Sequence, residues 1–236
     1  MAQWLARYFD IVEVTGSNPV LPTKMKAKNP TPKIIYQNSD LLVLDKPAGV
    51  NADDFPKRVH RLDKDTSGVL LVAKNDKTLE FLQKQFKERK VKKTYLALVT
   101  GNLKNKTGAI ETLLGRSAKD RRKQRVFLKE GPEAEGKREA VTKYRVLQSF
   151  KNYDLIEAEP LTGRKHQIRA HLAHLGHPIA GDKLYGFKNQ PCPEGLKRQF
   201  LHAKYLKIWL PDGQLKVFES NLAKDLELCL KKIKTM

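Results

Sequence analysis

The chain has 236 residues, with 46 Lys and Arg against 26 Asp and Glu, so its formal net charge is +20. Hydrophobic residues make up 40% of it, which excludes an intrinsically disordered protein, and no run reaches the ~18 to 20 apolar residues that a membrane-spanning helix needs. The basic excess attracts polyanions and favours a nucleic acid as partner. Charge alone does not separate an enzyme from a ribosomal protein or from a protein charged for solubility.

The N-terminal residues 1–24 differ from the rest of the chain. They carry few charges, contain two prolines, and lack the basic start and cleavage site of a signal peptide. A Lys- and Pro-rich stretch then opens at Met25 and continues through Lys33. We hypothesise that translation naturally starts at Met25. We predict that residues 1–33 form an N-terminal extension outside the fold and that residues 34–236 form one domain.

Short apolar runs typical of β-strands dominate the chain from Ile34 onwards. They cover residues 34–36, 41–44, 69–73, 95–99, 140–147, 153–159, 205–210 and 215–218. Helical patterns are scattered among them without regular βαβ alternation. This arrangement predicts an α+β fold with a mixed, mainly antiparallel sheet and flanking helices.

Three helices are predicted, over residues 76–89, 165–175 and 223–233. Asp76 can cap the first helix, and Gly176 and Pro178 end the second. The apolar side chains of the first helix are spaced to share one face; they are Leu79, Leu82 and Phe86.

A polar, glycine-bearing and charged region covers residues 115–137. Between Arg116 and Arg125 it holds six basic residues and one acidic residue. Like charges at this density repel one another, so we predict a mobile basic loop or hairpin tip that becomes ordered on a nucleic acid. A solvated loop with no partner is the alternative.

The segment from His60 to Gly68 contains the first candidate for chemistry. It stands before the apolar run 69–73, at the entrance of a strand. Arg61 and Lys64 flank Asp63, and cations so close favour the ionised carboxylate that can act as a nucleophile. On these residues alone, a role of Asp63 and Asp65 as turn formers is the stronger interpretation.

The longer string HRLDKDTSGVLLVAK, residues 60–74, resembles the signature of the RluA-type pseudouridine synthases. The first Asp of that signature is the catalytic residue of the family, which points to Asp63 and not to Asp65. Other segments agree in order and spacing, so that the resemblance spans about residues 34–218. They are LDKPAG (44–49), KTYLA (93–97), TGRKHQIR (162–169), GHPIAGD (176–182) and LHA (201–203).

The resemblance implies an isomerase of the cytoplasm that converts uridines of structured RNA to pseudouridine. The C1′–N1 bond of uridine is broken, the base turns, and it is rejoined through C5, which needs no redox change, cofactor or metal. The carboxylate can add to the sugar, add to the base or remove a proton from C2′, and the sequence does not choose among these routes. The target base must leave its stem at a cost of a few kcal/mol.

The resemblance also implies roles for individual residues. Tyr95 packs against the target base, where stacking returns ~1 to 3 kcal/mol, and Arg169 pairs with Asp63 and holds it ionised. Arg61 is a candidate to fill the space that the base leaves. On a helix that begins near Lys165, His166 and Arg169 would share a face. The candidate RNA contacts are Arg61, Lys46, Arg164, His166, Arg116, Arg121, Arg122, Lys123 and Arg125.

The histidines and cysteines are the candidate metal ligands of the chain. Four histidines lie within residues 166–177, but no HExxH arrangement occurs and Asp182 is the one carboxylate near them, so no metal site is predicted. Cys192 and Cys229 match no zinc or redox spacing and are expected to be free thiols in a reducing compartment.

Two departures from the family pattern limit the prediction of the substrate. The segment between Gly49 and His60 is short, and we expect no additional RNA-binding module before Ile34, so recognition should rest on the catalytic domain and its basic loop. Large-subunit ribosomal RNA is the favoured substrate, transfer RNA the second, and a monomer is expected. The alternatives are a non-catalytic RNA-binding protein and a hydrolase that releases uracil.

Overall fold

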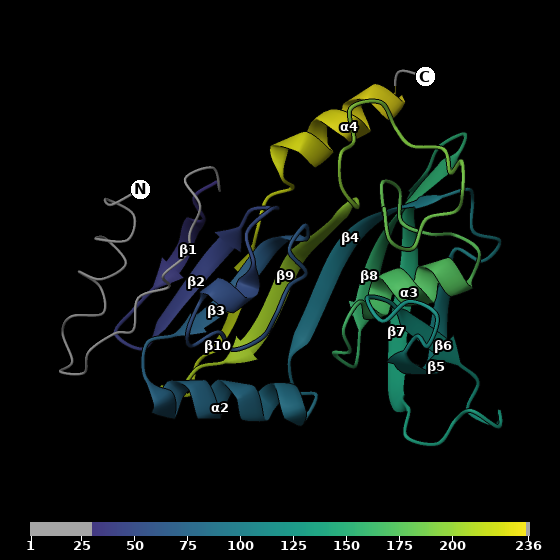
Figure 1. Ribbon diagram of the computed structural model, residues 1–236. Helices are drawn as coiled ribbons and strands as arrows, with labels where there is room; N and C mark the ends of the chain where they lie inside the picture. Colours follow the sequence, from purple (N-terminus) through teal and green to yellow (C-terminus); the bar gives the residue numbers. More distant parts are fainter. Residues whose placement is uncertain (1–29, 235–236) are drawn as a thin grey trace.

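The computed structural model describes residues 30–234, and the hypothesis about Met25 lies outside the described residues. One sheet of ten strands forms the centre of this part of the chain, in the order β1-β2-β3-β9-β4-β8-β7-β5-β6 with β10 paired to β9 (Figure 1). The strands are β1 (Lys33–Gln37), β2 (Leu41–Lys46), β3 (Ser67–Ala73), β4 (Lys92–Thr100), β5 (Thr107–Arg116), β6 (Gln124–Phe127), β7 (Arg138–Ser149), β8 (Tyr153–Pro160), β9 (Leu201–Trp209) and β10 (Leu215–Glu219).

Every pair of neighbouring strands is antiparallel except β3 and β9. The predicted α+β class with a mainly antiparallel sheet is therefore confirmed. Strands β5 and β6 were not predicted. The second of them lies inside the region predicted as a mobile loop or hairpin tip. The basic residues 116–125 occupy the tip of a β5–β6 hairpin, in agreement with the second of these alternatives.

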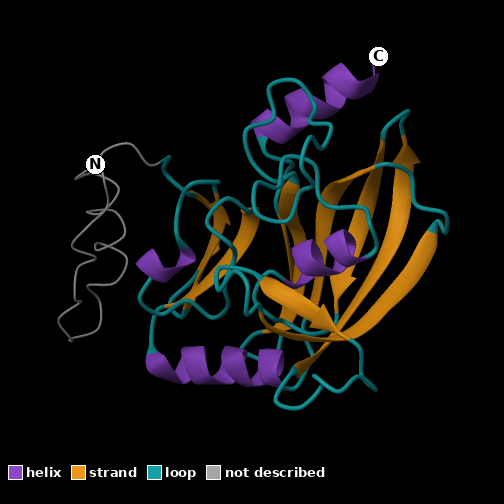
Figure 2. Ribbon diagram, turned by 45° about the vertical axis from the view of Figure 1, so that its right-hand side comes forward, coloured by secondary structure: helices purple, strands orange, loops and turns teal. Residues whose placement is uncertain are grey.

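Within residues 30–234, four helical segments accompany the sheet: η1 (Ala52–Asp54), α2 (Asp76–Lys87), α3 (Gln167–His174) and α4 (Lys224–Lys234). Figures 1 and 2 show α2 and α4 near opposite ends of the strands. No helix among residues 30–234 is long and apolar enough to cross a membrane.

The ends of two helices differ from the prediction. Asn75, and not Asp76, is the N-cap of α2, because its side chain accepts a hydrogen bond from the Thr78 N–H while its backbone is extended. The second predicted helix begins at Gln167 instead of Lys165, because His166 adopts the left-handed conformation with φ 53°.

The core positions the loop before β3. Every residue of β3 is buried, and Leu82 of α2 packs into the same apolar cluster as Val69 and Leu71, with Leu79 and Phe86 at its margin. A strand covered on both faces holds the segment that precedes it in a fixed place. The loop 59–66, which carries Asp63, is therefore attached to a strand that is buried along its whole length.

Strand β9 lies between β3 and β4 and joins the two halves of the sheet. It pairs with β3 through two residue pairs, Ser67 with His202 and Gly68 with Ala203. Gly68 has φ +115°, and a Cβ there would lie 2.1 Å from the carbonyl oxygen of Ala203. A glycine is required at this junction because any side chain would push β9 away from β3.

Candidate active site

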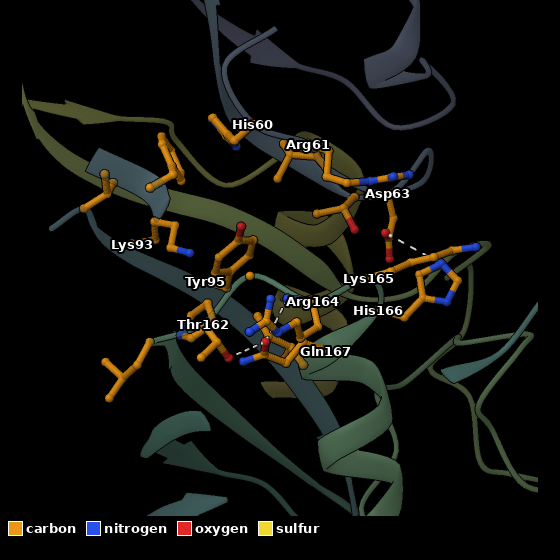
Figure 3. Close-up of a pocket in the computed structure, with 18 of the residues that line it drawn as sticks. His60, Arg61, Asp63, Lys93, Tyr95, Thr162, Arg164, Lys165, His166 and Gln167 are labelled. Atoms are coloured by element: carbon orange, nitrogen blue, oxygen red, sulfur yellow. Dashed lines mark hydrogen bonds and ion pairs between the residues drawn. The ribbon is translucent and has the colours of Figure 1, made fainter. Parts of the chain in front are cut away.

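A cavity of about 520 Å³ lies between the loop 59–66, the end of α2, strand β4 and the segment 160–169 (Figure 3). Among the described residues that line it, Asp63 is the one carboxylate. The same lining contains seven basic side chains that carry a permanent charge or an ammonium: Arg61, Lys87, Arg89, Lys93, Arg164, Lys165 and Arg169. A cavity so lined suits an anionic substrate.

The structure brings the predicted catalytic pair together across 106 residues of sequence. Nη1 of Arg169 donates a hydrogen bond of 2.9 Å to Oδ2 of Asp63. Both side chains are largely buried, with 8% and 17% of their surfaces exposed. A charge-assisted bond in a largely buried site fixes the direction of the carboxylate.

Arg169 is itself held by a second carboxylate, which the sequence did not single out for this role. Nε and Nη2 of Arg169 donate to the two oxygens of Asp182 at 2.7 and 2.9 Å. Asp182 Oδ1 also accepts from the N–H groups of Leu184 and Tyr185. Burial alone would raise the pKa of Asp182, but Arg169 and these donors outweigh it and lower that pKa. Asp182 therefore stays charged and orients the guanidinium toward Asp63.

Tyr185 completes the support of this pair. Its ring lies under the Arg169 guanidinium at 5.1 Å, and its hydroxyl is 3.2 Å from Nδ1 of His166. The same hydroxyl accepts a hydrogen bond of 2.6 Å from the N–H of Gln124 at the start of β6. Burial raises the pKa of Tyr185 to about 12. No sequence motif indicated this residue, which connects the basic hairpin to the site.

His166 approaches Asp63 by a route that the sequence did not predict. It stands outside α3 as its N-cap, so the expected shared helical face with Arg169 is wrong. Its left-handed backbone nevertheless places Nε2 3.7 Å from Oδ1 of Asp63, beyond hydrogen-bond distance. Burial lowers the pKa of His166, although Asp63 acts in the opposite direction. The imidazole is therefore neutral at pH 7.

Lys46, predicted to contact RNA, is instead a structural tether of the loop. It is fully buried, and its ammonium donates to the carbonyl oxygens of Pro47, Val50 and Lys64 at 2.8–3.0 Å. With all three of its N–H donors used inside the protein, it has none for RNA. Burial, reinforced by Arg198, lowers the pKa of Lys46 to about 7.

His60 and Arg198 anchor the same loop at other points. Nε2 of His60 accepts a hydrogen bond from the N–H of Leu71, and its ring stacks on Phe86 with centroids 5.0 Å apart. Burial lowers the pKa of His60 to about 3, in keeping with a nitrogen that must stay unprotonated to accept. Arg198 donates to the carbonyl oxygen of Asp65 and pairs with Asp225 of α4.

Tyr95 and Arg61 both line the cavity, as their predicted roles require. Burial, together with the field of Asp63, raises the pKa of Tyr95, so its hydroxyl stays protonated. Arg61 is exposed and lies near the cavity next to Asp63 in Figure 3. Arg164 lines the cavity as well, with Nε bonded to the carbonyl oxygen of Glu139.

The basic residues of the β5–β6 hairpin differ in how free they are to bind. Arg122 pairs with Asp120 at 2.8 Å, and Arg125 pairs with Glu133 at 2.9 Å. Lys123 lies 5.9 Å from the centre of the Tyr185 ring. Arg116 and Arg121 are exposed and form no ion pair with another described residue.

His171 and His177, two of the remaining histidines of the 166–177 segment, form hydrogen bonds elsewhere. His171 is buried between the hydroxyls of Thr112 and Thr142, and Nδ1 of His177 donates to the carbonyl oxygen of Thr100. No group of three or more potential metal ligands occurs in the described part of the chain. Cys192 and Cys229 are free thiols, as predicted.

Comparison with known proteins places these features in a family. A family model described as RNA pseudouridylate synthase matches residues 40–174, which include Asp63, Tyr95 and Arg169. An uncharacterized RNA pseudouridine synthase of Chlorobaculum parvum is 37% identical to this chain. The alignment covers 96% of this chain and 81% of the relative. Ribosomal large subunit pseudouridine synthase D of Borreliella burgdorferi is 36% identical over 81% of this chain and 65% of the relative.

Solved structures share the fold. Human RNA pseudouridylate synthase domain containing 1 matches with a TM-score of 0.68 and 28% identity, over 87% of this chain and 96% of that one. Human RNA pseudouridylate synthase domain containing 4 has a TM-score of 0.72 and 24% identity, over 85% and 92%. Among four of the curated relatives, the chain spans between 54% and 81% of the length of each.

Proposed function

The chain belongs to the RluA-type RNA pseudouridine synthases, a family of isomerases, and from this premise we propose that it modifies specific uridines of large-subunit ribosomal RNA with Asp63 as the catalytic carboxylate. The observation that carries the role of Asp63 is its pairing with Arg169 in a cavity where it is the one carboxylate among the described lining residues. The basic lining draws in the RNA, and the single negative group meets the ribose of the everted nucleotide.

The geometry supports a division of labour within the cavity. Arg169, fixed by Asp182, orients Asp63. Tyr95 offers a ring on which the everted uracil can stack, which returns ~1 to 3 kcal/mol. Arg61 stands at the mouth beside Asp63 and fills the space left in the RNA stem. The C1′–N1 bond breaks next to Asp63, and the stacked base turns until C5 faces C1′.

The choice of substrate rests on the relatives and on the basic hairpin. Enzymes of Borreliella burgdorferi, Nitrosomonas europaea and Vibrio vulnificus at 36–37% identity are named ribosomal large subunit pseudouridine synthases D or C. The hairpin tip 116–125 extends the basic surface beyond the cavity, where it can follow an RNA backbone. Transfer RNA is the second candidate. All residues of the site come from one chain, and its thiols are free, so we propose a cytoplasmic monomer.

Mapping of pseudouridines in total RNA tests this function. A deletion strain is complemented with the wild-type protein, with Asp63→Asn or with Asp65→Asn as a control in the same loop. We expect one or a few large-subunit sites to disappear and to return with the wild type and Asp65→Asn but not with Asp63→Asn. Restoration by Asp63→Asn would place catalysis elsewhere, and missing sites in transfer RNA alone would replace the proposed substrate.

The same strains separate the two rival functions. A non-catalytic RNA-binding protein predicts that no pseudouridine is lost on deletion. A hydrolase predicts free uracil and an abasic ribose, whereas the synthase yields an isomer of unchanged mass.

A further inference from the structure

Lys93 lines the cavity on the same strand as Tyr95 and has no place in the roles described above. It lies two residues before Tyr95 on β4, and side chains at that spacing project from the same face of a strand. In Figure 3 the Tyr95 ring separates Lys93 from Asp63. Lys93 is therefore positioned at the far edge of a base that stacks on Tyr95 with its sugar at Asp63.

The ammonium of Lys93 lacks a counter-ion in the described structure. It lies 5.7 Å from the centre of the Phe86 ring and 3.9 Å from where a Cβ on Gly163 would stand. Among residues 30–234, no carboxylate pairs with it, and the one on the cavity lining, Asp63, is engaged by Arg169. Burial lowers the pKa of Lys93 to about 8.

The neighbouring groups do not offset this charge. His60 is neutral, Tyr95 is protonated, Arg164 is a cation, and Gly163 contributes no side chain. A half-buried cation without a partner costs free energy. Such a cation is placed to meet a negative group that arrives with the substrate.

The reaction creates a negative group at this position. When the C1′–N1 bond breaks, its electron pair stays on the uracil, and the charge spreads over N1 and the two carbonyl oxygens. C5 then bonds to C1′ and loses its proton, while N1 gains one, so that atoms and charge balance. We propose that Lys93 pairs with a carbonyl oxygen of the detached uracil and stabilises its negative charge. This inference rests on the site proposed above.

The depth of Lys93 favours the base over an RNA phosphate as its partner. A phosphate contact can be made from the surface, as the exposed hairpin residues can do, and requires no burial. Lys93 instead shares a wall with the aromatic ring and faces Gly163, where the missing side chain leaves room for a flat ring. Charge that develops in a dry site is stabilised strongly by a preorganised cation.

Substitutions on adjacent lysines of β4 test the inference. Lys93→Met keeps most of the length of the side chain and removes its charge, Lys93→Arg keeps the charge, and Lys92→Met removes the charge of an exposed neighbour. We expect Lys93→Met to lower kcat roughly 100-fold with little change in the Kd for RNA. Lys93→Arg should retain most of the activity, and Lys92→Met should match the wild type.

Other outcomes would overturn the proposal. A rise in KM with unchanged kcat, accompanied by a flatter salt dependence of binding, would assign Lys93 to a phosphate. Unchanged kinetics would remove any role in the reaction. A lower Tm that accounts for the lost activity would make Lys93 structural, whereas removal of an unpaired buried charge should leave the Tm unchanged or higher.

The pH profile provides a readout that a structural role would not move. With a pKa of about 8, the ammonium is lost as the pH rises through that value, so kcat/KM of the wild type should fall there. Because arginine stays charged, the fall of kcat/KM should occur at higher pH in Lys93→Arg than in the wild type. A fall at the same pH in both proteins would contradict the proposal. If the wild-type protein converts no uridine in RNA, the proposed function fails. If the wild type is active and Lys93→Met has the same kcat, only the inference about Lys93 fails.

Discussion

The buried contact between Asp182 and Arg169 makes Asp182→Asn the sharpest test of how the site is held. The substitution keeps an oxygen for the N–H groups of Leu184 and Tyr185 but removes the charge opposite a guanidinium that is 8% exposed. Breaking a buried ion pair by removing one partner costs about 3–5 kcal/mol. Because the amide still accepts one bond from Arg169, we expect the lower end, about 3 kcal/mol.

This loss is large enough to measure in two ways. For a domain of about 200 residues, 1 kcal/mol lowers the Tm by roughly 2–4 °C, so a fall of roughly 6–12 °C is expected in calorimetry. The released Arg169 no longer aims Asp63, and a misplacement of about 1 Å lowers kcat on the order of 100-fold. Single-turnover conversion of RNA measures that second effect.

A matched control and a double variant complete the test. Asp120→Asn removes a carboxylate that also binds an arginine at two points, but at the exposed hairpin tip. Surface pairs contribute little, so its Tm should stay close to that of the wild type. Asp182→Asn combined with Arg169→Met should cost less than the sum of the single changes, because the uncompensated charge is gone. A wild-type Tm and full activity for Asp182→Asn would refute this account of the site.

Three further perturbations follow from the structure. Replacing Arg121 and Lys123 by Gln should lower the slope of log K for RNA against log salt by about one for each phosphate that the variant no longer binds. Arg125→Gln should have a smaller effect, because Arg125 already pairs with Glu133. A slope that none of the three substitutions changes would exclude the hairpin from RNA binding. Burial, reinforced by His174, lowers the pKa of His171 from 6.5 to about 4. Between pH 4 and 6.5 the unfolded chain binds a proton at this residue that the folded chain does not. The free energy of unfolding should therefore fall with falling pH by up to about 1.4 kcal/mol per pH unit. Urea titrations across that window should show a flatter dependence for His171→Gln, and parallel curves would rule out this linkage. Two substitutions of Tyr95 can be compared in the Asp63→Asn background, which stops turnover. Tyr95→Phe should bind RNA as tightly as Asp63→Asn alone, whereas Tyr95→Ala should lose ~1 to 3 kcal/mol of stacking. Equal RNA affinities of the Phe and Ala variants would show that no base rests on this ring.

The sheet was largely predictable because most of its strands are local apolar runs. Strand β5 was not, since its inward side alternates Ile110, Thr112 and Leu114, and a buried threonine weakens the apolar signal. Strand β6 lies within a charged stretch, where its pairing with β5 decides the structure. The left-handed backbone of His166 accompanies a contact with Tyr185 that no local pattern reveals.

The site could be predicted only in part, for a related reason. The residues around Asp63, taken alone, favoured a turn, and the pairing with Arg169 was expected only through the family resemblance. Lys46 was misassigned as an RNA contact because a lysine in sequence carries no sign of its burial. Asp182 was visible in the GHPIAGD segment, but its contact with Arg169 is tertiary. Lys93 was visible in the KTYLA segment, but its place on the cavity wall is tertiary. Tyr185 had no signal that set it apart from ordinary loop residues.

The position of β9 has a consequence for when the protein can first act. The ribosome completes β3 and β4 early, but the strand that sets their spacing emerges only after α3 and Asp182 have been made. A nascent chain that has not yet reached Leu201 already exposes its basic residues, so it can adhere to RNA without aligning Asp63 with Tyr95. Pairing between such distant segments is also slow to form. We therefore expect modification to require a chain that has been made through β9, and products that end before β9 to bind RNA without modifying it.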